Sequence, residues 1–201
     1  MLLKRHDIGV NARDEGGRTA LMMASSKGHL GAVRTLVKNK NVRASANAQD
    51  NRGRTALIEA SAECRLEVVC ELLRQDAVDA NAVDKKGSTA FAWASYLGHW
   101  DLCREFLKHD KVNVNAQGLH GNTALIWATL GNHADVVSDL LEHDKVSANV
   151  KNKAGSTALD IARKCDLLDI VNLLEVHTKR CLLREFDVKL RIGGNAETAP
   201  N

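Results

Sequence analysis

Histidine and cysteine are the residue types of this 201-residue chain that could bind a metal or act as nucleophiles, and it contains eight histidines and five cysteines. A zinc site needs several such ligands at short, regular spacing. His29, His99 and His133 instead share one position of a sequence repeat, so stacked units would hold them roughly 10 Å apart, too far to share an ion. The cysteines form no Cys-x-x-Cys pair. We therefore expect no metal site and no cofactor.

The sequence also lacks the short motifs of the common catalytic classes. It contains no phosphate-binding loop, no Gly-x-Ser-x-Gly and no His-Glu-x-x-His. The cysteines are typical of buried or half-buried thiols in a reducing compartment, which favours the cytoplasm, with the nucleus as the alternative. A net charge of +3 and an aromatic content of 3% do not indicate nucleic-acid binding. We expect a protein that is not an enzyme, takes no small-molecule substrate and does not insert into a membrane.

A repeated segment with the skeleton Gly-x-Thr-Ala-Leu-x-x-Ala accounts for most of the chain. Its glycines are spaced 36, 34, 34 and 34 residues apart, a period typical of a repeat array. Each glycine suits a turn with positive φ, and the threonine suits the N-cap of a short helix. A second break and a second, amphipathic helix follow, as in residues 134–141. The five leading glycines are Gly17, Gly53, Gly87, Gly121 and Gly155.

This skeleton resembles the ankyrin-repeat family, through the Thr-Ala-Leu or Thr-Ala-Phe starts and the pairs Gly28-His29 and Gly98-His99. The resemblance covers residues 10 to 176 and implies an all-α solenoid of five helix-pair repeats with β-turn fingers. It further implies a non-catalytic protein-interaction scaffold or adaptor. The alternative is a targeting or substrate-recognition module of a larger enzyme, channel or ubiquitin-ligase complex. Alanine replaces the family's proline, and the first-helix histidine is missing, so these repeats should depend more on apolar packing.

The period also predicts the organisation of the chain. We expect residues 1–9 to be the remnant or partial cap of a preceding repeat, which favours a fragment of a longer protein. The segment 177–193 is expected to be an extension with a short helix followed by an extended stretch, and 194–201 a disordered tail. The residues inserted near 39–46 are expected to form a loop. The five repeats are placed at about 10–45, 46–79, 80–113, 114–147 and 148–176.

The turn tips and the residues that follow them carry eight basic residues against four acidic ones, whereas the second helices are mainly acidic. In the geometry that the resemblance implies, the tips and first helices form one concave binding surface. Apolar side chains with arginine nearby fit the composition of binding hot spots. We expect the partner to be a protein with an acidic segment, bound by a monomer. The candidate binding residues are Arg18, Arg52, Arg54, Lys85, Lys86, Tyr96, Leu97, Leu119, His120 and Leu130.

Trp93 and Trp127 occupy equivalent places in neighbouring first helices. We expect them to pack between adjacent repeats in the core. A pair of aromatic rings facing a ligand is the alternative.

Overall fold

The structure is a computed structural model that describes residues 9–193, with side chains described up to residue 184. The expected disordered tail and all but the last residue of the expected N-terminal remnant lie outside the described residues. The helices of the described part are α1 (Ala20–Ser26), α2 (Leu30–Val37), α3 (Lys40–Ala44), α4 (Ala56–Ala62), α5 (Leu66–Leu73), α6 (Ala90–Tyr96), α7 (Trp100–Leu107), α8 (Ala124–Leu130), α9 (Ala134–Glu142), α10 (Ala158–Lys164) and α11 (Leu168–Gly193).

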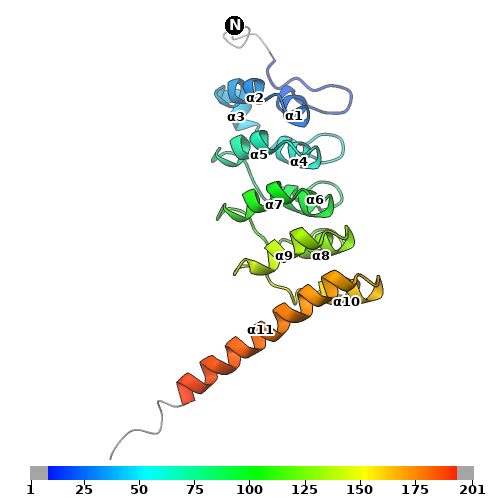
Figure 1. The fold of residues 1–201 in the computed structure, drawn as a ribbon. Helices are drawn as coiled ribbons and strands as arrows, with labels where there is room; N and C mark the ends of the chain where they lie inside the picture. The colour runs from blue at the N-terminus through cyan, green and yellow to red at the C-terminus, as the bar shows by residue number, and fades with distance from the viewer. Residues whose placement is uncertain (1–8, 194–201) are drawn as a thin grey trace, which may run out of the picture.

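The helices form antiparallel pairs that stack in chain order into an elongated solenoid (Figure 1). The first helices, α1, α4, α6, α8 and α10, form one layer, and the second helices, α2, α5, α7, α9 and α11, form the other. The turns that lead into the first helices project from the stack. We call these turns fingers 1 to 5, at residues 14–18, 50–54, 84–88, 118–122 and 152–156.

Each first helix begins as the repeated motif predicts. The leading glycines have φ between +70° and +78°, which a side chain would strain. The threonine two residues later is the N-cap, and its hydroxyl accepts from the main-chain N–H three residues further on, as Thr123 does from Ile126 at 3.4 Å. This cap ends the finger and sets the direction of the helix.

The core lies between the two helix layers and is continuous along the stack. Leu57, Phe91 and Leu125 occupy the same position in successive first helices, and each is 2% exposed. Phe91 packs against Phe106 of the paired second helix, with ring centroids 5.4 Å apart. Burial of these equivalent side chains joins each helix pair to its neighbours.

His99 and His133, which precede the second helices α7 and α9, bridge neighbouring repeats, as expected of structural rather than metal-binding residues. The His99 ring lies 3.4 Å from the carbonyl of Ala62, and the His133 ring lies 3.0 Å from that of Tyr96. Arg65 takes the same place one repeat earlier and donates to Ser26 O at 2.9 Å. These bonds satisfy carbonyls at the ends of the first helices.

Two local expectations are wrong. The insertion after α2 forms the short helix α3, because the side chain of Asn39 caps it and Val42 is buried. The C-terminal segment has no extended stretch, because α11 continues without a break to Gly193. Elongation of a helix that is already nucleated costs little, so β-branched residues such as Val188 do not end it.

Candidate functional site

The basic residues predicted to bind a partner lie on the fingers. Arg18, Arg52, Lys85 and Lys86 are exposed. Arg18 forms an ion pair with Asp14 in its own finger at 2.8 Å, and the main-chain N–H of Arg18 together with this ion pair lowers the pKa of the Asp14 carboxyl. The remaining three belong to fingers 2 and 3. These neighbouring fingers therefore present a cluster of three cationic side chains to solvent.

Arg54 is in a different environment from the other predicted cations. It is half-buried, pairs with Glu59 at 3.2 Å, and its guanidinium lies 4.6 Å from the centroid of the Trp93 ring. A charge that is paired and stacked in this way is an integral part of the packing. Arg54 is thus a positioning residue for Trp93, and its replacement would disturb the fold as well as the surface.

The predicted apolar residues are all exposed, between 37% for Leu97 and 54% for Leu119. Tyr96 and Leu97 lie at the end of α6, and Leu130 ends α8. Tyr96 also packs edge-on against the ring of Trp127, with centroids 5.4 Å apart. Among the four predicted apolar residues, Tyr96 therefore has its ring packed against another aromatic side chain.

A pocket of about 370 Å³ lies between the helix pairs α6–α7 and α8–α9, on the side of the first helices. Its aromatic walls are Trp93, Tyr96 and Trp127, and Lys86 and His120 contribute nitrogen donors from fingers 3 and 4. We call it the aromatic pocket. Its complete lining is Lys86, Ser88, Ala92, Trp93, Tyr96, His120 and Trp127, with no carboxylate among them.

The two tryptophans lie only partly in the core that the sequence led us to expect: Trp93 packs against the core cluster, and Trp127 packs against Tyr96 of the neighbouring repeat. Both are half-buried and line the aromatic pocket. Their equivalent places in neighbouring first helices were the signal for this pair. Sequence alone cannot decide between core and pocket, because a large ring at the edge of the core serves both.

Asp84 fixes the position of Trp93. Its carboxylate accepts from the indole N–H of Trp93 at 2.9 Å and from the main-chain N–H groups of Lys86 and Ser88 at 2.8 and 2.9 Å. Asp84 is only 6% exposed, so these bonds lie largely away from water. One side chain therefore holds finger 3 and one wall of the aromatic pocket together.

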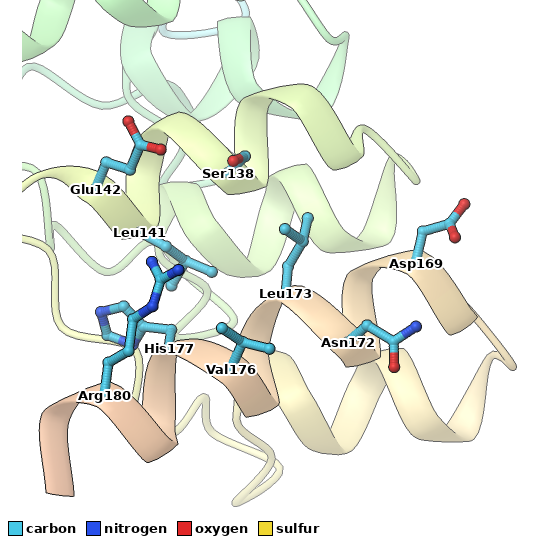
Figure 2. Close-up of a pocket in the computed structure, with 9 residues that line it drawn as sticks. All are labelled: Ser138, Leu141, Glu142, Asp169, Asn172, Leu173, Val176, His177 and Arg180. Carbon is cyan, nitrogen blue, oxygen red and sulfur yellow. The ribbon is translucent and has the colours of Figure 1, made fainter. Parts of the chain in front are cut away.

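A second pocket of about 490 Å³ lies between the second helices α9 and α11 (Figure 2). Leu173 of α11 points toward α9, and His177 and Arg180 follow along the same helix. Glu142 and Asp169 also line it, so its charges are mixed in sign. Partial burial, with Arg184 and Arg180 nearby, lowers the pKa of His177.

Two properties of the described residues bear on metal binding and on nucleophilic chemistry. No three histidine, cysteine or acidic residues within 9–193 are grouped as metal ligands. Burial raises the pKa of the Cys103 thiol to about 12, which suppresses the nucleophilic thiolate. In the same part of the chain no helix is long and apolar enough to cross a membrane.

Comparison with known proteins gives one family. The model described as ankyrin repeats (3 copies) matches residues 1–84, 75–152 and 111–181. The chain belongs to the ankyrin-repeat family. Ankyrin repeats are generally protein–protein interaction modules, and proteins built from them are typically non-catalytic. A comparison with curated proteins finds no significant match.

Proposed function

We propose that this ankyrin-repeat protein is a non-catalytic scaffold or adaptor that binds an acidic segment of a protein partner. The binding surface would extend over fingers 2 to 4 and the first helices α4, α6 and α8. The observation that carries this proposal is the juxtaposition of exposed Arg52, Lys85 and Lys86 with the aromatic pocket. Cationic groups would attract an acidic segment, and the aromatic walls would bury one of its side chains.

The distribution of charge supports this surface over the opposite one. The second helices carry exposed acids such as Glu67, Asp101 and Asp135. An acidic segment would be repelled there and attracted to the fingers. Because the finger cations are exposed, salt should weaken the association, with screening over about 8 Å at physiological ionic strength.

The test compares partners captured from a cell lysate by two charge-reversal variants and the wild-type chain. The first variant carries Arg52→Glu, Lys85→Glu and Lys86→Glu. The control reverses the same number of exposed charges away from the fingers, at Lys38, Arg43 and Arg74. Arg54 is left unchanged because its reversal would break a half-buried ion pair. Circular dichroism establishes that all three proteins are folded.

We expect a partner that the wild type and the control capture and the finger variant loses. That partner, purified, should then bind the wild type more weakly as salt is raised. Capture of the same proteins by all three chains would contradict the proposal, as would binding of the purified partner that does not respond to salt.

A further inference from the structure

The joint between fingers 3 and 4 is built differently from the other joints between fingers. The Asn51 N–H donates to Gly16 O at 2.9 Å, the Lys85 N–H to Arg52 O at 2.9 Å, and the Lys153 N–H to His120 O at 3.0 Å. These main-chain bonds join finger 1 to 2, 2 to 3, and 4 to 5. Among the described residues, no main-chain bond of this kind joins finger 3 to finger 4.

A side-chain link is missing at the same joint. Gln49 donates to Val83 O at 2.8 Å, and Gln117 donates to Lys151 O at 2.9 Å, each reaching the next repeat. Val83 occupies the equivalent position in the third repeat and has no polar group to offer. Finger 4 therefore has fewer hydrogen bonds to finger 3 than the other fingers have to their predecessors, although its main chain packs closely against Gly87.

Finger 4 also lacks the carboxylate that organises fingers 2 and 3. Asp50 and Asp84 accept main-chain bonds within their own fingers, and Asn152 does so in finger 5. The equivalent position in finger 4 is Gly118. A Cβ there would overlap the carbonyl oxygen of Gly87, so the close approach of the two fingers requires a glycine.

The absence of a carboxylate at position 118 leaves Trp127 without a nearby acceptor. In the preceding repeat the indole N–H of Trp93 donates to Asp84, but Gly118 offers Trp127 no such acceptor. The Nε1 of Trp127 is buried and has no hydrogen-bond partner in the described structure. A buried donor without an acceptor is rare in native proteins and calls for a specific explanation.

We propose that the aromatic pocket takes a glutamate or aspartate side chain of the bound segment, and that the indole N–H of Trp127 donates to its carboxylate. The incoming carboxylate would occupy the role that Asp84 plays for Trp93. Lys86 and His120 would flank it, and finger 4, which has fewer hydrogen bonds to finger 3, would shift so that the carboxylate reaches the buried Nε1. This inference rests on the proposed function and specifies which group of the acidic segment enters the pocket.

Charge decides against the opposite ligand for this pocket. Three aromatic rings can also enclose a cation, such as a methylated lysine. Such a ligand would meet Lys86 at the rim and no carboxylate in the lining. Neither an ammonium nor a quaternary nitrogen can accept the Trp127 proton, so the unpartnered donor would stay unpartnered.

The test uses nuclear magnetic resonance of the full-length ¹⁵N-labelled protein. Its three tryptophans give three indole N–H signals, assigned from the single variants Trp93→Phe, Trp100→Phe and Trp127→Phe. The probes are acetyl-Gly-Glu-Leu-Gly-amide, its glutamine counterpart, and a third peptide with trimethyl-lysine in place of glutamate. Each is titrated into the millimolar range. Trp100 lies on second helix α7, so its signal is an internal control.

We expect the glutamate peptide to shift the Trp127 signal downfield, while the Trp100 signal stays in place. The glutamine peptide should bind about ten times more weakly, because charge-assisted bonds are the stronger ones. Lys86→Gln, a change of an exposed side chain, should weaken binding of the glutamate peptide much more than binding of the glutamine peptide. An unmoved Trp127 signal, equal binding of the two peptides, or tighter binding of the trimethyl-lysine peptide would overturn the inference. If the peptides fail while the finger variant still loses its partner, the pocket inference is refuted and the proposed function stands.

Discussion

Replacement of Asp84 by alanine should destabilise the protein and release one wall of the aromatic pocket. The carboxylate is 6% exposed and accepts three hydrogen bonds, from two main-chain N–H groups and from the indole of Trp93. Alanine leaves these donors without an acceptor, although the cost of burying the carboxylate is also removed. At about 1 kcal/mol or more for each lost bond to a charged group, we expect a loss of about 2–4 kcal/mol in the free energy of unfolding. Urea unfolding followed by circular dichroism measures it.

Asp84→Asn is the matched control, because finger 5 already uses an asparagine at this position. Asn152 accepts from the main-chain N–H groups of Ala154 and Ser156 at 3.0 Å each. The amide should therefore keep both turn bonds and lose only the bond from Trp93, at a cost of about 1 kcal/mol. The indole signal of Trp93 should move upfield in both variants. The reasoning is refuted if asparagine destabilises as much as alanine, or if alanine costs much less than about 1 kcal/mol.

Three further predictions concern the stack itself. Leu125→Ala should lower the free energy of unfolding, measured in urea, by about 2–5 kcal/mol, because that side chain is 2% exposed. Leu130→Ala should change it little, because Leu130 is 42% exposed. Similar losses for the two variants would contradict the core assignment. Gly87→Ala should destabilise more than Gly155→Ala, since both have positive φ but only at Gly87 would a Cβ overlap the main chain of the next finger; equal melting temperatures would argue against close packing of the fingers. Burial raises the pKa of the Cys103 thiol from 9.0 to about 12. At pH 8 this thiol should therefore react with an aromatic disulfide about a thousandfold more slowly than an ordinary thiol, until urea unfolds the chain. Rapid reaction in the native protein would show that the site is open.

The sequence was sufficient for the repeated parts of the fold because their determinants are local. A threonine such as Thr123 caps the helix that starts at the next residue, and a glycine such as Gly121 adopts φ of +74° whatever lies beyond it. Both effects depend on the chain within a few residues. The same glycine and threonine recur in every copy, so each copy strengthens the prediction made for the others.

The candidate site was less predictable because it depends on contacts between repeats. The sequence places Arg54 among the basic residues of the fingers, yet Glu59 and the ring of Trp93 hold it half-buried. Trp127 was expected in the core, yet it lines a pocket closed in part by Tyr96 and His120. These outcomes depend on how deeply a groove forms between neighbouring helix pairs, and that depth is a property of the stack rather than of any one segment. The expected boundaries of the five repeats stay a prediction.

Comparison of equivalent positions in the different repeats indicates how the aromatic pocket arises. Two positions that are polar in the other four repeats are not polar at one joint: Val83 cannot make the side-chain link, and Gly118 supplies no carboxylate, which leaves the indole of Trp127 without an acceptor. Val83 precedes finger 3 and Gly118 begins finger 4, so no single local preference accounts for both changes. Each loss costs stability or leaves a donor unsatisfied. Both changes lie next to the fingers that border the aromatic pocket, and a bound carboxylate would supply the acceptor that Trp127 lacks.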